Sequence, residues 1–235
     1  SIMINPFNNL LPKEFSVTTF NIGYCSLDKS NDFFFEGGLN TRGISKEKVI
    51  ENLEGNSKII EDLKSDIYLL QEVDESGSRS HHVNQLEYIT SRFDNFNNSF
   101  AFNYRLKYLF YPFLKPMGSA YSGLLTLSKF MIKESSRYAL EGQETFPRSL
   151  FFIKRCMTVN IIKTIDEKEL YMINIHLSAY DKNGDIRKQQ AEFILNYLND
   201  IYDVNKNYII IGGDWNHLLP KEDYNDNMPF WVSLL

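Results

Sequence analysis

Four short apolar stretches of the chain each end in a polar residue. They are residues 16–21, 67–72, 170–176 and 208–214, and they end in Asn21, Glu72, His176 and Asp214. Aliphatic and β-branched runs of this length are typical of strands that are buried on both faces. A buried strand has no use for such polar residues unless its end opens onto a site, and sites in α/β sheets gather at the carboxyl ends of strands. The pattern therefore predicts an active site that is built from four strand ends.

The remaining periodicity predicts helices between these strands. Apolar residues at helical spacing follow Ser45, which we expect to be an N-cap, and a second helix spans residues 83–93. Asp185 is expected to cap a long helix that reaches Ile201. Residues 123–128 and 157–163 read as further strands. The alternation of strand and helix predicts the α/β class, with hairpin pairs mixed in.

Composition limits the domain organisation and the partners. A chain of 235 residues with 43% hydrophobic residues fits one large α/β domain, so we expect an entry segment at 1–14 and a single domain over 15–235. The net charge is −5 and no block of Lys and Arg occurs, which argues against passive binding to a polyanion. An enzyme that meets phosphate through a bound cation is not excluded, because the cation inverts the local charge logic.

Cysteines and apolar runs say little about the compartment. The two cysteines, Cys25 and Cys156, are too few for a disulfide framework. We expect small buried residues, with a single disulfide as the alternative. No run of about 18 apolar residues occurs, so the sequence predicts no membrane-spanning helix. The first residue is Ser, which leaves open a removed signal or anchor segment and therefore the localisation. The many Asn, Lys and Ile residues favour an AT-rich bacterial source.

Each strand-end residue has a chemical and a structural interpretation. Glu72 suits Mg²⁺, which takes one or two protein carboxylates, but a capping or ion-paired Glu is equally consistent. Asn21 can orient a carboxylate or a metal-bound water, or it can simply form a turn. His176 can donate to a phosphate oxygen or transfer a proton, and the alternative is a buried structural imidazole.

The segment around Asp214 is more informative. Two glycines precede Asp214, and they allow a substrate or backbone to approach closely. Asp214 and Asn216 are two residues apart, so in an extended chain both side chains face the same way and His217 faces the opposite way. An acid beside an amide can accept a proton from a nucleophilic water and hold a phosphoryl group. A glycine-rich turn without function is the alternative.

Together these pieces resemble one family. The segments TFNIGY, LLQEVD, SGLLTLSK, NIHLSAY and GGDWN occupy residues 19–24, 69–74, 122–129, 174–180 and 212–216. In this order they resemble the endonuclease/exonuclease/phosphatase superfamily, which includes pancreatic deoxyribonuclease. The match spans nearly the whole chain and is specific for the superfamily, but not for a substrate. It implies a four-layer α/β sandwich of two mixed β-sheets flanked by helices.

The resemblance also implies roles for the site residues. Glu72 would be the principal ligand of Mg²⁺, or alternatively of Mn²⁺, with help from Asn21. His176 would contact the scissile phosphate, Asp214 would orient or deprotonate the attacking water, and Asn216 would steady the phosphoryl group. Weaker candidates for substrate binding are Arg155, Tyr180, Arg79 and His82. An ion-paired or solvated side chain is the alternative at Arg155.

The implied function is metal-dependent hydrolysis of phosphate esters, as a Mg²⁺-dependent phosphodiesterase of the nuclease type. Sphingomyelinase-like or inositol-phosphate phosphatase activity is an alternative, so the substrate is a nucleic acid, a phospholipid headgroup or an inositol phosphate. A non-catalytic phosphate-binding relative is the alternative from another class. The oligomeric state is left open.

Two segments depart from the pattern or fall outside it. The family pattern ends with a strand that carries Asp-His, and no such pair follows GGDWN before Leu235. We therefore expect this chain to lack the C-terminal strand of the family and to continue in its parent protein, or else to be inactive. The aromatic residues of segment 104–113 favour a core hairpin, with a base-stacking or bilayer-touching loop as the alternative.

Overall fold

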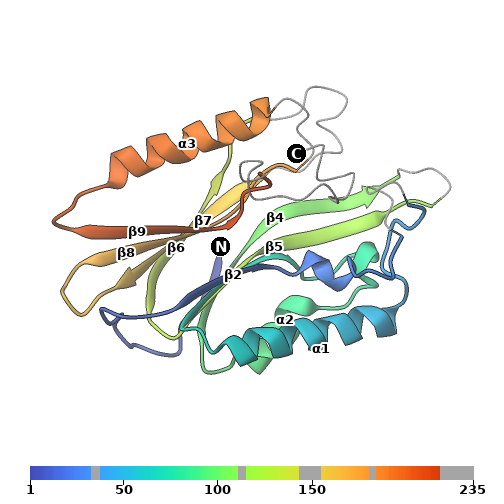
Figure 1. Cartoon of the computed structure of the whole chain (residues 1–235), viewed down its shortest axis with the longest axis horizontal. Helices are drawn as coiled ribbons and strands as arrows, with labels where there is room; N and C mark the ends of the chain where they lie inside the picture. The colour runs from blue at the N-terminus through green and yellow to red at the C-terminus, as the bar shows by residue number, and fades with distance from the viewer. Residues whose placement is uncertain (33–37, 111–114, 143–154, 180–183, 218–235) are drawn as a thin grey trace, which may run out of the picture.

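Two β-sheets pack face to face and carry helices on their outer faces (Figure 1). The computed structural model describes residues 1–32, 38–110, 115–142, 155–179 and 184–217. Helices α1 and α2 cover one sheet and α3 covers the other, so the order of layers is helix, sheet, sheet, helix. The predicted four-layer α/β sandwich is therefore confirmed.

Sheet one has five strands among the described residues. Their order is β1 (Ile2–Ile4), β4 (Asn97–Leu109), β5 (Gly118–Ser128), β3 (Ile67–Asp74) and β2 (Val17–Asn21). Only β2 and β3 are parallel, and the chain between them forms α1 (Lys46–Leu63). Helix α2 (Gln85–Arg92) follows β3, and two short 3₁₀ turns lie at Gly23–Cys25 and Ser78–Ser80.

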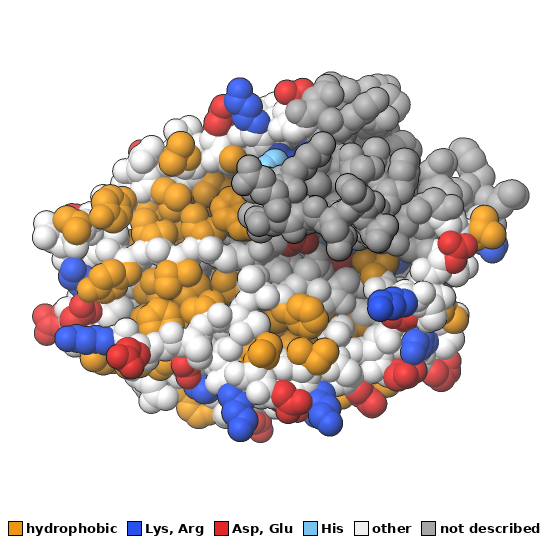
Figure 2. All heavy atoms as spheres, viewed as in Figure 1, with side chains coloured by type: hydrophobic (Ala, Val, Ile, Leu, Met, Phe, Trp, Pro, Cys, Tyr) orange, Lys and Arg blue, Asp and Glu red, His pale blue; other side chains and the backbone are white. Residues whose placement is uncertain are grey.

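Sheet two has four described strands. Their order is β6 (Ile132–Ala139), β7 (Cys156–Lys163), β8 (Glu169–His176) and β9 (Asn207–Asp214). Here β8 and β9 are the parallel pair, and α3 (Asp185–Ile201) connects them. Strands β2 and β9 end the order of their sheets, and Figure 2 shows apolar side chains gathered over this part of the surface.

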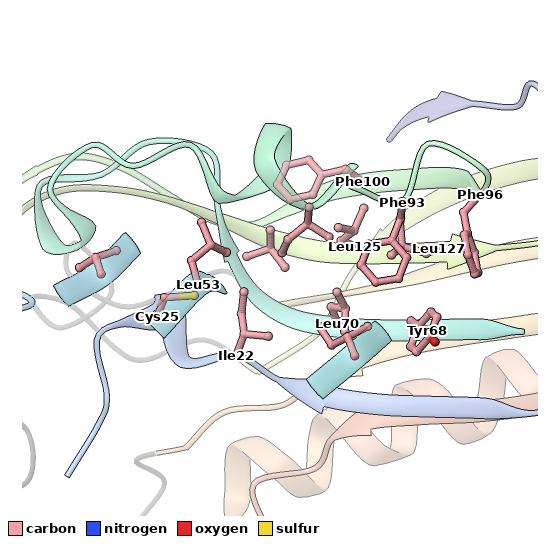
Figure 3. Close-up of a cluster of buried hydrophobic side chains, with 14 residues drawn as sticks. Ile22, Cys25, Leu53, Tyr68, Leu70, Phe93, Phe96, Phe100, Leu125 and Leu127 are labelled. Carbon is pink, nitrogen blue, oxygen red and sulfur yellow. The ribbon is translucent and has the colours of Figure 1, made fainter. Parts of the chain in front are cut away.

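Strict alternation explains why the strands read as apolar on both faces. In β3, Tyr68 and Leu70 pack with residues of α1 and α2, whereas Ile67 and Leu69 pack with residues of sheet two. Figure 3 shows the first of these clusters, in which Tyr68 makes an edge-on contact with Phe93 at a centroid distance of 5.6 Å. Strand β8 behaves likewise, so each sheet has one face for helices and one for the other sheet.

Most of the predicted elements are confirmed, and one helix start is wrong. Ser45 caps α1 as predicted, because its hydroxyl accepts a hydrogen bond from the Lys48 amide at 3.1 Å. The predicted cap of α3 is wrong, since Gly184 holds that position with a left-handed φ of 73°. Asp185 instead lies in the first turn, where its charge is favourable to the helix dipole.

The structure also shows the conformation of the aromatic segment and the state of the two cysteines. Strand β4 pairs with β5 in antiparallel register, so the described part of the aromatic segment is a hairpin as predicted, but its placement in the core is wrong at Tyr108 and Phe110, which are exposed. Tyr111 and Phe113, like the phenylalanines at 33–35, lie outside the described residues. Both cysteines are buried free thiols, and burial raises the pKa of Cys25 to about 12 and of Cys156 to about 11. No helix among the described residues is long and apolar enough to cross a bilayer.

Core packing gives a direct test of the fold. Leu127 is fully buried in the cluster of Figure 3, whereas Leu195 on α3 is 57% exposed. We expect Leu127→Ala to lower the free energy of unfolding by about 2–5 kcal/mol, because it removes buried methyl groups and leaves a cavity. Leu195→Ala is the matched control and should change it by less than about 0.5 kcal/mol. Urea unfolding measures both, and equal losses would contradict the assigned packing.

Candidate active site

The four strand-end residues lie together at one end of the space between the sheets. Asn21 ends β2 and Glu72 lies near the end of β3 in sheet one, while His176 and Asp214 end β8 and β9 in sheet two. The His176 Nε2 atom is 3.9 Å from Glu72 Oε1 and 3.7 Å from Asp214 Oδ2. Asn21 Nδ2 donates to Asp214 Oδ2 at 2.7 Å. Each sheet thus contributes half of the site.

Regular alternation brings three of these residues to the space between the sheets. In β2, Val17 and then Thr19 face sheet two, and Asn21 follows on the same face. In β8 and β9 the same rule directs His176 and Asp214 toward sheet one, and these two residues are partners in the parallel ladder. The backbone pattern of each strand is sufficient to place these side chains.

Glu72 reaches the site only because β3 is irregular. By alternation it would share the helix-facing side of Tyr68 and Leu70. The pairing of β3 with β5 instead shifts between Leu70 and Val73, and Glu72 adopts a left-handed φ of 57°. Val73 then packs with the helices and the Glu72 carboxylate approaches His176. Bulges of this kind re-aim side chains next to active sites, and left-handed non-glycine residues are uncommon.

Asp214 is held by hydrogen bonds to both carboxylate oxygens. Asn21 Nδ2 donates to Oδ2, and the Asn216 backbone N–H donates to Oδ1 at 2.9 Å. Asn21 is fixed in turn, because its Oδ1 accepts from the Gly23 N–H at 2.9 Å. The carboxylate therefore has one orientation, with 27% of its side chain exposed.

The expected extended geometry after Asp214 is wrong. Asn216 has a left-handed φ of 46°, and its Nδ2 donates to the Leu177 carbonyl at 2.8 Å. This bond fastens the end of β9 to the residue after His176, so the backbone turns instead of continuing as a strand. The preceding glycines serve close packing, since a Cβ on Gly213 would stand 2.1 Å from the Ile175 carbonyl oxygen. His217 is exposed.

Burial sets the charge of the two central groups. Burial raises the pKa of the Glu72 carboxyl, and Arg79 and Arg155 offset this only in part. Burial, followed by the charges of Arg155 and Arg79, lowers the pKa of His176 well below 6.5, so its imidazole is neutral at neutral pH. Among the described residues, Glu72 Oε2 and His176 Nδ1 are buried without a hydrogen-bond partner. Both atoms are therefore able to bond to a ligand, although some serine hydroxyl groups elsewhere are also buried without a partner.

The four weaker candidates have different surroundings. Arg155 is 7% exposed, and its pKa is lowered by burial although Glu72 and Asp214 act against this. Arg79 is also buried, but its guanidinium is occupied by Asp74. His82 is exposed on the surface, with Nδ1 3.2 Å from a serine hydroxyl. Tyr180 lies outside the described residues.

Asp74 is a buried partner that sequence reasoning missed. Arg79 Nη2 and Nε donate to its two oxygens at 2.7 and 3.1 Å, and Ser80 Oγ donates at 2.8 Å. The Arg79 guanidinium also lies 3.8 Å from the centre of the Tyr24 ring. Burial by itself lowers the pKa of Arg79, but Asp74 outweighs burial and the net shift is upward. The signal in the sequence was a second acid two residues after Glu72.

Oxygen donors in the site fit a small divalent cation. Within the described ranges, no group of three or more His, Cys, Asp and Glu residues has the arrangement of a metal cluster. Mg²⁺ does not require one, because it binds through one or two carboxylates and keeps several waters. Glu72 offers an oxygen without a partner, and Asn21, which bonds to Asp214, offers an amide oxygen. The site therefore offers oxygen ligands of the kind that Mg²⁺ prefers, and the unpartnered oxygen of the Glu72 carboxylate can accept a cation.

Solved structures with the same fold are numerous but distant in sequence. An endonuclease/exonuclease/phosphatase from Beutenbergia cavernae is 16% identical, with a TM-score of 0.58. The matched part is 91% of this chain and 51% of the chain from B. cavernae. TDP2 of D. rerio, complexed with single-strand DNA product, is 15% identical, with a TM-score of 0.53. The matched part is 87% of this chain and 61% of the TDP2 chain. ANGEL2, a 2′,3′-cyclic phosphatase, is 18% identical, with a TM-score of 0.54. The matched part is 86% of this chain and 52% of the ANGEL2 chain. This chain thus spans between half and two thirds of each.

The family assignment comes from sequence. No curated protein matches the chain. Residues 19–231 match the profile of the Endonuclease/Exonuclease/phosphatase family, which includes every strand end that contributes to the site. The chain therefore belongs to the Endonuclease/Exonuclease/phosphatase family.

Proposed function

We propose that the protein is a metal-dependent phosphoesterase, specifically a Mg²⁺-dependent phosphodiesterase that acts on nucleic acid. The observation that carries the proposal is the convergence of Asn21 and Glu72 from one sheet with His176 and Asp214 from the other. Membership of the family supports hydrolysis of a phosphate ester. A nucleic-acid substrate is favoured by the similarity to TDP2, whose structure holds a single-strand DNA product.

Glu72 and Asn21 are the residues proposed to hold the cation. A buried carboxyl with a raised pKa and an unpartnered oxygen gains most from a positive charge beside it. When bound, the cation stabilises negative charge on the phosphoryl oxygens and makes a water more acidic.

His176 and Asp214 are proposed to act on the phosphate and the water. A neutral imidazole carries one N–H, which His176 can donate through Nε2 to a phosphate oxygen, because this atom faces the two carboxylates. Asp214 is fixed by two donors, and its remaining lone pairs can orient a water and accept its proton. Asn216 then serves by fixing the end of β9.

The two buried arginines are proposed to have different tasks. Arg79 is held by two hydrogen bonds to Asp74 and supplies a fixed positive charge. Arg155 makes no hydrogen bond through its guanidinium to any other described side chain, and it acts electrostatically on Glu72 and Asp214. A buried guanidinium beside two carboxylates can bind a phosphate group in two-pronged geometry. Arg155 is therefore our candidate for the second contact to the substrate.

Glu72→Gln tests the cation-binding role. It keeps the shape of the side chain but removes its charge, and we expect hydrolysis of DNA with Mg²⁺ to fall by about a thousandfold or more. Glu51→Gln, at a side chain that is 69% exposed, is the matched control and should keep the wild-type rate. Equal rates for wild type and Glu72→Gln would rule out the proposed site.

The substrate panel for this assay contains plasmid DNA, single-stranded DNA, sphingomyelin and inositol phosphates, each with Mg²⁺ and with chelator. Hydrolysis of DNA alone supports the nuclease-type activity. Hydrolysis of a lipid or inositol phosphate instead would replace it by the corresponding alternative. Failure of the wild-type protein on every substrate would favour a non-catalytic relative.

Asp214→Asn separates proton transfer from binding. The amide cannot accept a proton from water, so we expect kcat to fall by about a hundredfold to ten-thousandfold, with KM changed far less. Asp200→Asn, on the exposed side of α3, is the control for the same chemical change and should leave kcat intact. Steady-state kinetics on the best substrate measures both. A raised KM with unchanged kcat would mean that Asp214 binds substrate without acting on water.

His176 predicts a pH dependence of stability in the metal-free protein. Its pKa in the folded state lies below the ordinary 6.5, so the unfolded chain binds the extra proton first. The free energy of unfolding should therefore fall as pH drops below about 6.5, by at most about 1.4 kcal/mol per pH unit. His176→Gln should flatten this slope, and His82→Gln, which removes an exposed imidazole, is the control. Urea unfolding with chelator, at a series of pH values below about 6.5, measures these slopes. Equal slopes of unfolding free energy against pH for wild type and His176→Gln would contradict the buried neutral state.

A further inference from the structure

A pair of buried amide side chains crosses between the sheets directly beneath the site. Gln71 of β3 donates through Nε2 to Asn174 Oδ1 of β8 at 2.8 Å, and the same nitrogen lies 3.2 Å from Thr19 Oγ1 of β2. Gln71 is 1% exposed and Asn174 is 0% exposed. We call Gln71 and Asn174 the amide clasp. It joins three strands of the four that carry the site.

The position of the amide clasp ties it to both halves of the site. Gln71 is the residue before Glu72 and the ladder partner of Asn21. Asn174 lies two residues before His176 and therefore on the same face of β8. The hydrogen bond from Asn21 to Asp214 also connects the two sheets at the strand ends, but both of its residues belong to the site itself, whereas Gln71 and Asn174 lie outside it.

Asn174 also contacts the irregular part of β3. Its Nδ2 lies 3.3 Å from the Leu70 carbonyl oxygen and 3.3 Å from the Leu125 carbonyl oxygen. Leu70 and Leu125 are partners at the last paired position before the shift of register that re-aims Glu72. A side chain from sheet two thus satisfies backbone acceptors of sheet one where the ladder of sheet one is interrupted.

Energy alone does not explain two amides at this place. The surrounding contact between the sheets is apolar, and a buried amide contributes little net stability but costs much when one partner is removed. Fully satisfied polar networks do specify a single arrangement of a core, because their hydrogen bonds have direction. Apolar side chains of the same size would fill the space without choosing a register.

We propose that the amide clasp is a positioning device, which holds the β3 bulge and the two sheets in the register that brings Glu72 to His176. Gln71 and Asn174 are then positioning residues for hydrolysis, and this catalytic consequence rests on the proposed function. Their effect on the geometry does not depend on it. Loss of the clasp should leave a folded protein in which the two halves of the site no longer meet correctly.

The fold contains a matched contact that serves as a control. Asn160 of β7 donates through Nδ2 to Thr126 Oγ1 of β5 at 3.1 Å and accepts from Ser99 Oγ of β4. This contact is also polar, buried and between the sheets. It lies farther from the strand ends, because Asn160 pairs with Met172, four residues before His176. It makes no hydrogen bond to the bulge.

The experiment compares two variants, in each of which the polar side chains of one contact are replaced by apolar side chains of similar size. Gln71→Met with Asn174→Leu replaces the clasp, and Ser99→Ala, Thr126→Val and Asn160→Leu together replace the control contact. Urea unfolding and circular dichroism first establish that both proteins are folded. If the double variant does not fold, the single variant Gln71→Met takes its place. In that variant Asn174 keeps its hydrogen bonds to the Leu70 and Leu125 carbonyl oxygens.

Two readouts do not require catalysis. The imidazole NMR resonances of His176, recorded with chelator, should move in the clasp variant and stay at their wild-type positions in the control. The affinity for Mg²⁺, measured by calorimetry, should weaken by about tenfold to a hundredfold in the clasp variant, as for other residues that orient ligands. Where hydrolysis is measurable, kcat should fall by about a hundredfold, because displacements near 1 Å have that effect.

The outcomes separate the two proposals. Wild-type protein that hydrolyses nothing overturns the proposed function, while the His176 resonances still decide the role of the clasp. A folded clasp variant with wild-type resonances and wild-type Mg²⁺ affinity overturns the positioning role. Equal losses in the clasp and control variants also overturn it, because they would show a general effect of removing polar contacts between the sheets.

Discussion

The register between the two sheets is the constraint on which the rest of the structure depends. Within each sheet, backbone ladders fix β2 beside β3 and β8 beside β9. No strand of one sheet pairs with a strand of the other among the described residues, so side-chain contacts, both apolar and hydrogen-bonded, set the separations of 3.9 Å and 3.7 Å around His176 Nε2. Apolar packing supplies most of the attraction between the sheets but little direction. Direction comes from the buried polar side chains that cross the interface.

The site holds a buried carboxylate oxygen, of Glu72, and a buried imidazole nitrogen, of His176, that have no hydrogen-bond partner in the described part of the chain. Asp74, by contrast, has Arg79 and Ser80 as partners, although hydroxyl groups such as those of Ser57 and Ser122 are also buried without a partner. Leaving such groups unpaired costs stability, and a ligand that pairs with them recovers that cost on binding. The same strain appears in the backbone, where Glu72 and Asn216 both have positive φ.

Much of the fold could be predicted from the sequence because buried strands and amphipathic helices have clear periods. Strands β3, β8 and β9 each contain a continuous apolar run, β2 is rich in β-branched residues, and Ser45 is a standard helix cap. Strand β6 was missed because it is half exposed and its sequence is largely polar, and β1 was missed because three residues are too short for a periodic pattern. The cap of α3 was assigned wrongly because glycine and aspartate are adjacent there, and both are common near helix starts.

The sequence by itself determined which residues end the strands, and alternation then determined that Asn21, His176 and Asp214 face the space between the sheets. Only the tertiary structure decided that Glu72 joins them, because regular alternation would have turned it toward the helices. The bulge that turns it depends on pairing with β5 and on Asn174, whose contacts to Leu125 and Leu70 span 49 and 104 residues. Contacts so distant in sequence leave no local pattern, since they exist only once both sheets have formed and packed together.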